Sequence, residues 1–443
     1  MSEGEGWERE EVVGLLSEAR ARTLLLIAPL SPEDLRIQHS PLMSPIVWDL
    51  GHIAHFEEVW LLTRAGRSSG EASEGLAGTF NPFENPRNTR GQLELPCRGE
   101  ALEYLARVRR SVLDRLDELA PDPSDPLLRA GYVLRLVLQH EYQHNETILQ
   151  TLQLKRGEPY PAPRSIALPH PGPAWRERAG EMVRCPGGRV EVGTNDRSVA
   201  YDNERPRHDV ELAPFLIDVA PVTNGEYLAF IEAGGYVDRA FWSDAGWAWL
   251  QDEAVEAPAS WRREGEGRWS IRSMDRREEL RPLDPVCHVS YHEACAYARY
   301  ADKRLPTELE WEAAATWDFE RGEKLHFPWG ERAPEPTLAN VDQVSFQTAP
   351  LGSYPSNVSP IGCYGMIGDV WEWTSSDFEG YPGFESFPYP EYSEVFFGSE
   401  QKVLRGGSWA TRAGALRSTF RNWDFPARRQ IFAGFRCAKD TER

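Results

Sequence analysis

The sequence predicts an α+β protein in two parts: an N-terminal four-helix bundle and a C-terminal domain of short strands, short helices and long loops. The chain has 443 residues, more than the ~100–200 residues of a usual single domain. Apolar residues recur at helical intervals up to about residue 156 and then cease to do so. We therefore expect the bundle in residues 1–157, a Pro-rich linker in 158–176 and the second domain in 177–443.

Four segments carry the helical pattern of the first domain, namely residues 11–28, 45–64, 100–119 and 125–154. Four amphipathic helices of this length predict an antiparallel bundle. A stretch rich in Gly, Ser, Asn and Pro, residues 66–96, separates the second and third helices. Because it is too long for a simple turn of a bundle, we interpret it as a substrate loop.

The second domain begins after a stiff linker, in which residues 159–173 contain six prolines. Short β-like runs follow at residues 189–192 and 215–219, with helical segments at 224–233 and 291–302. The rest of the chain is dense in Gly and Trp, which indicates structured loops packed around aromatic rings.

The composition limits the expected partners. Lys and Arg together number 49 and Asp and Glu 69, giving a formal net charge of −20. Such a field repels nucleic-acid phosphates and anionic lipids, so neither nucleic acid nor a membrane is expected as a partner. With no long apolar run and no basic leader segment, we expect a cytoplasmic protein that acts on small molecules. The six cysteines form no C-x-x-C pair, which argues against a disulfide framework or a zinc ribbon.

Two histidines in the fourth helical segment, His140 and His144, have the spacing that places two imidazoles one turn apart on one helix face. The second helical segment carries His52 beside Gly51, where the missing side chain would let a neighbouring helix approach. His52 would complete a set of three imidazoles, which suits Fe(II), Cu or Zn about equally and leaves positions open for substrate and dioxygen.

The same segment is similar to the His-Glu-x-x-His motif of zinc proteases, with Glu141 after the first histidine. The third ligand expected just downstream is absent, and a second histidine-bearing helix exists. A zinc hydrolase, and a histidine pair without any metal, both remain open on this pattern alone.

His52 with His140-x-x-x-His144 resembles the DinB-like helical domain of the sulfoxide synthases of ergothioneine biosynthesis. The second domain resembles the formylglycine-generating-enzyme superfamily, whose fold is a variant of the C-type lectin fold. The motifs of this second resemblance are residues 222–227 (VTNGEY), 304–312 (RLPTELEWE), 368–373 (GDVWEW), 405–409 (RGGSW) and 434–437 (GFRC). Together the two resemblances cover nearly the whole chain, and their combination in this order is more specific than either half.

The resemblance implies an O2-dependent, non-haem iron enzyme with Fe(II) as cofactor and His52, His140 and His144 as ligands. His55 would lie either near the metal without binding it or at the surface. The implied reaction joins the sulfur of γ-glutamylcysteine to imidazole C2 of hercynine and oxidises that sulfur to a sulfoxide. Relatives that use free cysteine, or attack another imidazole carbon as in ovothiol synthesis, leave the thiol and the position open.

Two further alternatives come from the same superfamily. Formylglycine generation needs a reactive cysteine pair shortly after the Gly-Gly-Ser motif, and Thr411 and Leu416 stand where those thiols would be expected. A protein of this architecture that binds a metal or small ligand without turnover is the other.

On the loop, Arg87 and Arg90 are three residues apart and form a fork suited to carboxylate capture. The resemblance implies that they bind the carboxylates of γ-glutamylcysteine. Gln143 and Asn422 would hydrogen-bond hercynine. Trp423 would face its trimethylammonium group by cation–π attraction, and Asp424 would pair with a substrate ammonium.

A tyrosine is the expected catalytic residue. Tyr389 matches the family's catalytic tyrosine in a Tyr-x-x-Tyr-Ser segment, and Tyr392 is the competing choice. A phenol near the iron would donate a proton or a hydrogen bond to reduced oxygen. The resemblance implies an active site in the cleft between the two domains.

Overall fold

The computed structural model describes residues 8–66, 78–163, 173–265 and 267–441. Two compact units are present. The helical unit consists of Met1–Pro161 with Asp196–Val199, and the mixed unit of Ala162–Asn195 with Ala200–Arg443. No helix in the described ranges is long and apolar enough to cross a membrane. Because residues 164–172 of the expected linker lie outside the described residues, the predicted domain boundaries stay a prediction.

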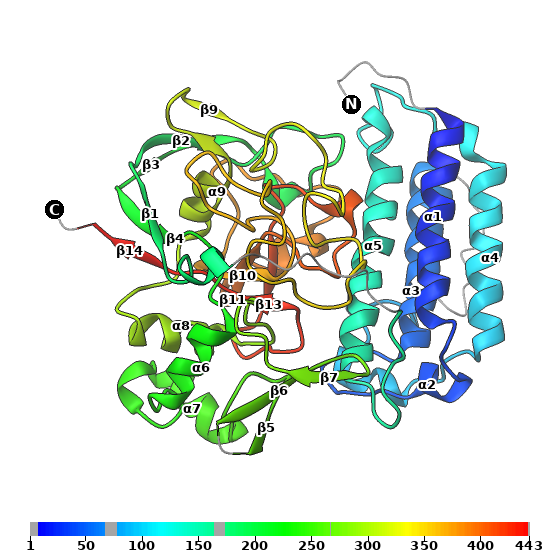
Figure 1. The fold of residues 1–443 in the computed structure, drawn as a ribbon. Coiled ribbons are helices and arrows are strands. Elements are labelled where there is room, and N and C mark those ends of the chain that lie inside the picture. Colours follow the sequence, from blue (N-terminus) through cyan, green and yellow to red (C-terminus); the bar gives the residue numbers. More distant parts are fainter. Residues whose placement is uncertain (1–7, 67–77, 164–172, 266, 442–443) are drawn as a thin grey trace. The chain divides into compact units, whose positions relative to one another are not determined.

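Four long helices build the helical unit (Figure 1), as the sequence predicted. Their bounds are α1 (Arg9–Ile27), α3 (Ile46–Glu57), α4 (Arg98–Asp114) and α5 (Tyr132–Gln153). A π-helical segment, η1 (Glu58–Ala65), continues α3. The shorter elements are α2 (Pro32–Arg36), η2 (Arg87–Gln92), η3 (Leu116–Leu119) and η4 (Arg129–Gly131).

The last long helix starts later than expected. The apolar pattern predicted a helix from residue 125, whereas α5 begins at Tyr132. Just before it, Ala130 and Gly131 have φ values of 52° and 70°. Two successive residues in the left-handed region cannot continue a right-handed helix, and periodicity does not report this break.

The core of the bundle contains a charge ring, one side chain from each long helix: Arg20 (α1), Glu57 (α3), Arg109 (α4) and Glu141 (α5). Each arginine pairs with both glutamates at N···O distances of 2.5 to 3.0 Å. All four side chains are at most 10% exposed. Burying charges is costly unless each has a partner, and in the charge ring two positive and two negative groups cancel.

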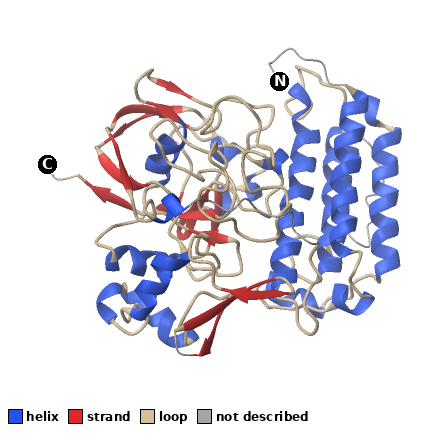
Figure 2. Ribbon diagram, in the orientation of Figure 1, coloured by secondary structure: helices blue, strands red, loops and turns tan. Residues whose placement is uncertain are grey.

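Short strands and short helices make up the mixed unit (Figure 2). Its sheets are a four-stranded one in the order β12-β11-β10-β13, two three-stranded ones, β1-β4-β14 and β5-β6-β7, and the pairs β2-β3 and β8-β9. The strands are β1 (Met182–Cys185), β2 (Gly188–Val192), β3 (His208–Leu212), β4 (Phe215–Asp218), β5 (Trp261–Gly265), β6 (Arg268–Ser273), β7 (Arg276–Glu279), β8 (Trp317–Asp318), β9 (Glu323–Lys324), β10 (Trp371–Phe378), β11 (Gly398–Arg405), β12 (Asn422–Asp424), β13 (Ala433–Gly434) and β14 (Ala438–Asp440). The helices are α6 (Asn224–Glu232), α7 (Asp244–Glu253), α8 (Tyr291–Tyr300) and α9 (Glu308–Thr316). The α+β fold class is confirmed.

A buried core holds these sheets and helices together. It includes Val190, Phe215, Ile217, Trp311 and Met366. Motif glutamates take part in several of its buried ion pairs, among them Glu308 with Arg421, Glu312 with Arg405 and Glu372 with Arg436. The arginines are at most 1% exposed, so these motif residues stabilise the fold from the inside.

Candidate metal centre

Three histidines of the helical unit come together, His52 from α3 and His140 and His144 from α5. Their ligand-capable nitrogens all lie within 4.8 Å of one another. The ring centroids of His140 and His144 are 4.6 Å apart. The ring centroid of His52 lies 4.9 Å from that of His140 and 5.0 Å from that of His144. One nitrogen from each ring can therefore contact a single metal ion. His55 is not a member of this group.

Hydrogen bonds at the outer ring nitrogens fix two of the histidines. His52 Nδ1 lies 2.8 Å from the carbonyl oxygen of Phe80, and His144 Nδ1 lies 3.1 Å from Asp49 Oδ1. A carbonyl or carboxylate oxygen only accepts, so each Nδ1 carries the hydrogen and each Nε2 keeps its lone pair. His52 Nε2 and His140 Nε2 are 3.1 Å apart.

Aromatic rings hold the imidazoles in place. Trp48 stacks on His52 with centroids 4.8 Å apart, and Phe56 stacks on His140 at 3.7 Å. The Arg90 guanidinium lies 3.4 Å from the centroid of Trp48 on this unit. The rings therefore have little freedom to rotate, and the three nitrogens are preorganised.

The closest approach at Gly51 is made by Phe80, not by a neighbouring helix. A Cβ at Gly51 would lie 2.1 Å from Phe80 Cζ. The missing side chain thus makes room for the residue whose carbonyl oxygen orients His52.

The electrostatics of the group suit a cation. Burial, followed by the neighbouring His144, lowers the pKa of His52 and His140 well below the usual range, and neutral imidazole is the form that binds metals. Asp49 is 1% exposed, and its Oδ2 has no hydrogen-bond partner among the described residues. A buried carboxylate calls for positive charge nearby. Three imidazoles beside one buried carboxylate fit a divalent metal ion.

Glu141 does not belong to this group. Its carboxylate pairs with Arg20 and Arg109 in the charge ring and accepts a 2.8 Å hydrogen bond from Thr23. A zinc protease needs its glutamate at the metal as a general base. The geometry therefore argues against the hydrolase interpretation.

The two loop arginines have different surroundings, although both lie on η2. Arg90 is 5% exposed and donates to Ser44 Oγ at 2.7 Å and to the Asn85 carbonyl at 2.8 Å. Burial lowers the pKa of its guanidinium to about 10. Arg87 is exposed. The half-buried Gln143 precedes His144 on α5, and residues 67–77 of the expected substrate loop lie outside the described residues.

In the mixed unit, the candidate residues Trp423 and Tyr389 belong to one aromatic cluster, which Tyr392 links. Asn422, Trp423 and Asp424 make up β12, which pairs with β11. Trp423 stacks on Phe378 at 4.1 Å. The ring of Tyr392 lies 6.1 Å from Trp423, 6.2 Å from Tyr389 and 4.4 Å from Tyr201. Asp424 lies near Arg428 and Gln430, at 3.5 and 3.3 Å.

Sequence reasoning missed three supporting residues. Asp49 precedes His52 by three residues on one helix face, and that spacing could have revealed it. Phe80 acts through its backbone, which leaves no signal in the sequence. Asp202 accepts from the Phe387 amide at 3.1 Å and from the Ser393 hydroxyl. It thereby ties both ends of the segment that carries Tyr389.

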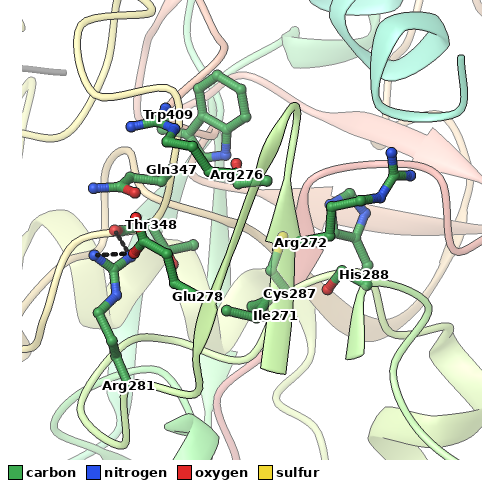
Figure 3. Close-up of a pocket in the computed structure, with 12 residues that line it drawn as sticks. Ile271, Arg272, Arg276, Glu278, Arg281, Cys287, His288, Gln347, Thr348 and Trp409 are labelled. Carbon is green, nitrogen blue, oxygen red and sulfur yellow. Dashed lines mark hydrogen bonds and ion pairs between the residues drawn. The ribbon is translucent and has the colours of Figure 1, made fainter. Parts of the chain in front are cut away.

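A separate cavity of about 30 Å³ in the mixed unit is lined in part by residues of β6 and β7 (Figure 3). Two of its arginines are engaged in the fold. Arg281 pairs with Asp284 at 2.6 Å and donates to the Thr348 carbonyl, and Arg276 donates to the Phe346 carbonyl. None of the candidate site residues lines this cavity.

Comparisons with known proteins agree with this architecture. Residues 15–148 match the DinB superfamily, and residues 168–441 match the sulfatase-modifying factor enzyme 1-like domain. Hercynine oxygenase from Mycolicibacterium thermoresistibile is 44% identical over 443 residues, covering 98% of this chain and 96% of the relative. Hercynine oxygenase from Mycobacterium tuberculosis is 43% identical, covering 97% and 99%.

A formylglycine-generating enzyme from Streptomyces coelicolor is 36% identical and covers 63% of this chain and 96% of its own length. The hercynine oxygenases, in contrast, match both units at higher identity. This chain is therefore an oxygenase and belongs to the hercynine oxygenase family, the sulfoxide synthases of ergothioneine biosynthesis that its motifs resemble.

Proposed function

We propose that this protein is an Fe(II)-dependent sulfoxide synthase that joins the sulfur of γ-glutamylcysteine to imidazole C2 of hercynine and uses O2 to oxidise the sulfur. The observation that carries the proposal is the group of three preorganised imidazoles in a chain whose relatives are hercynine oxygenases. Its partners would be small molecules only, and its location cytoplasmic, as the charge and composition suggest.

His52, His140 and His144 would hold the iron, two of them through the Nε2 atoms that their outer hydrogen bonds leave available. Bound Fe(II) supplies coordination positions where a thiolate and dioxygen can meet. Trp48 and Phe56 stack on the rings of His52 and His140 and restrict their rotation.

Arg87 and Arg90 would bind the carboxylates of γ-glutamylcysteine. Their surroundings support different roles for the two arginines. Arg87 is exposed and can meet a carboxylate directly, whereas Arg90 is buried and uses Nε and Nη1 to anchor η2 beside it. Charge-assisted, bidentate contacts of this kind favour a thiol with more than one carboxylate over free cysteine.

Hercynine would be bound by polar and aromatic groups. Gln143 and Asn422 would hydrogen-bond its polar atoms, and Trp423 would attract the trimethylammonium group. Asp424 would pair with a substrate ammonium. That residues of both units act on one substrate stays a prediction.

Tyr389 would act as the proton donor that favours sulfoxide formation over oxidation of the thiol to a sulfinate. A phenol with its ordinary pKa near ~10 is protonated at neutral pH and needs no base of its own. Tyr392 packs against Tyr201 at 4.4 Å, which supports a structural role for it.

Tyr389→Phe should keep iron and O2 consumption but shift the product towards sulfinate, whereas Tyr392→Phe should leave the product ratio nearly unchanged. Wild-type product from Tyr389→Phe would assign Tyr389 to packing.

The deciding experiment is an assay with anaerobically reconstituted Fe(II) protein, hercynine and either γ-glutamylcysteine or cysteine. Product identity is determined by mass spectrometry and NMR. We expect O2 uptake that requires hercynine and the thiol together, with γ-glutamylcysteine as the better thiol. Iron binding without joint stimulation would instead indicate the non-catalytic alternative.

Metal content separates the ligands from their neighbour. Replacing His52, His140 or His144 with Ala should sharply reduce iron occupancy, because each change removes one of three protein bonds. His55→Ala is the matched control and should retain the metal. Loss of iron in His55→Ala with retention in His52→Ala would overturn the assignment.

A further inference from the structure

We propose that Asp49 is a positioning residue of the metal centre, which holds His144 in its metal-binding tautomer and provides the buried negative charge that balances the ion. This inference rests on the proposed metal site and deepens it. Neither the family match nor the histidine pattern assigns a role to this carboxylate.

The placement of Asp49 follows from the helix that carries it. On α3 it lies three residues before His52, so both side chains point to the same side of the helix. The contact from Asp49 Oδ1 to His144 Nδ1, 3.1 Å long, crosses from α3 to α5. One helix thus supplies a candidate ligand and also the partner of a ligand on another helix.

The described residues do not satisfy both oxygens of the Asp49 carboxylate. An ionised carboxylate can accept about four hydrogen bonds. At Asp49 one oxygen accepts from His144 Nδ1, and the other, buried, has no hydrogen-bond partner in the described part of the chain. The nearby Arg90 does not fill this gap, since it donates to Ser44 and Asn85.

A metal ion on His144 would place positive charge near this buried carboxylate. Coordination at Nε2 withdraws electron density from the ring, which makes the Nδ1 hydrogen a stronger donor to Asp49. The carboxylate in turn makes the imidazole a more basic ligand. Metal and carboxylate would therefore stabilise each other through the His144 ring.

A purely structural role makes a different prediction. Asp49 lies in the first turn of α3, where a carboxylate also interacts favourably with the helix dipole. In that case its removal would lower the stability of the metal-free protein and leave the metal untouched. Asp34, in the first turn of α2, offers a matched control because it contacts Ser31 and Lys155 and none of the three histidines.

The test compares Asp49→Asn, Asp49→Glu and Asp34→Asn in the full-length protein. Metal affinity is measured by competition with a chelator for Co(II), together with the absorption spectrum of the Co(II) form. Because an asparagine can turn its NH2 group to His144, it can favour the tautomer with the hydrogen on Nε2. We expect Asp49→Asn to bind Co(II) roughly 10–100-fold more weakly with an altered spectrum, Asp49→Glu to retain more affinity, and Asp34→Asn to match wild type.

Urea unfolding of each metal-free variant separates stability from metal binding. Wild-type affinity and spectrum in Asp49→Asn would overturn the inference, however much stability is lost. If Asp49→Asn does not fold, Asp49→Glu decides, since wild-type spectrum and affinity after displacement of the carboxylate would contradict a positioning role. A wild-type protein that binds no metal at all would be a failure of the proposed metal site itself, which is a distinct result.

Discussion

Replacing Gly51 with Ala adds one methyl group at the point where Phe80 meets α3. The new Cβ would lie 2.1, 2.2 and 2.7 Å from three ring atoms of Phe80, distances at which the ring must move. Phe80 is completely buried and packs near Trp48 and Tyr104, with ring centroids 6.3 and 6.2 Å away. Because the surroundings are filled, the ring cannot move without displacing its own backbone.

The magnitude follows from three contributions, one stabilising and two destabilising. Gly→Ala inside a helix normally stabilises by ~0.8–1 kcal/mol. Overpacking a filled core costs ~1–3 kcal/mol, and the loss of the hydrogen bond from His52 to the Phe80 carbonyl costs a further ~0.5–1.5 kcal/mol. We expect Gly51→Ala to lower the free energy of unfolding by roughly 1–3 kcal/mol, and to weaken metal binding because His52 loses its orienting partner.

Urea unfolding of the metal-free protein measures the change in the free energy of unfolding. Gly14→Ala is the matched control: it lies within α1, and an added Cβ there would meet nothing within 4 Å. We expect Gly14→Ala to stabilise by ~0.8–1 kcal/mol, so the two substitutions should differ in sign. Equal stabilisation by both would refute the proposed role of Phe80 at Gly51.

Three further predictions concern the charged groups. Glu141→Gln breaks the charge ring and should lower the free energy of unfolding by ~3–5 kcal/mol. Substitution of the exposed Glu118 with Gln is the control and should change it little. A Glu141→Gln variant with wild-type stability in urea would contradict the predicted contribution of the charge ring. Arg87→Leu should weaken the apparent binding of γ-glutamylcysteine by ~1.5–3 kcal/mol and leave the free energy of unfolding unchanged. Arg90→Leu should weaken thiol binding and also lower the free energy of unfolding, because it removes buried hydrogen bonds. Steady-state kinetics and urea unfolding measure the two effects, and an unchanged thiol KM in both variants would exclude a role of these arginines in thiol binding. Burial raises the pKa of Asp369 to about 7, above its unfolded value of ~3.9, so the folded protein holds an extra proton and the contribution of Asp369 to stability falls as pH rises from ~4 to ~7. Asp369→Asn should remove this component from the pH dependence of unfolding, and an identical pH profile would count against it.

Sequence patterns predicted the long helices and the helix spacing of His140 and His144, because helical period and ligand spacing are local properties of the chain. They could not show that Glu141 turns away from the metal, since its direction depends on arginines from α1 and α4 that arrive only with the tertiary fold. The same limit applies to Phe80, whose contribution is a backbone carbonyl.

Burial was the other property that spacing left undetermined. Arg87 and Arg90 look equivalent as a fork in the sequence, yet one is exposed and the other buried between Trp48, Ser44 and the loop backbone. The motifs of the mixed unit also suggested function, whereas Glu308, Glu312 and Glu372 lie in ion pairs of its interior. A sequence motif indicates that a residue is important, and only the packing of the folded chain shows whether it serves the fold or a ligand.

The charge ring of Arg20, Glu57, Arg109 and Glu141 has a consequence for how the bundle assembles. Any three of the four helices would bring together three of these groups and leave an uncompensated unit charge in a partly formed core. Removing α1 or α4 leaves an excess glutamate, and removing α3 or α5 leaves an excess arginine. An isolated buried charge is expensive, so partly docked intermediates are disfavoured against both the unfolded chain and the complete bundle. The four helices should therefore dock in a single cooperative step, and the three imidazoles of α3 and α5 come together only in the finished bundle.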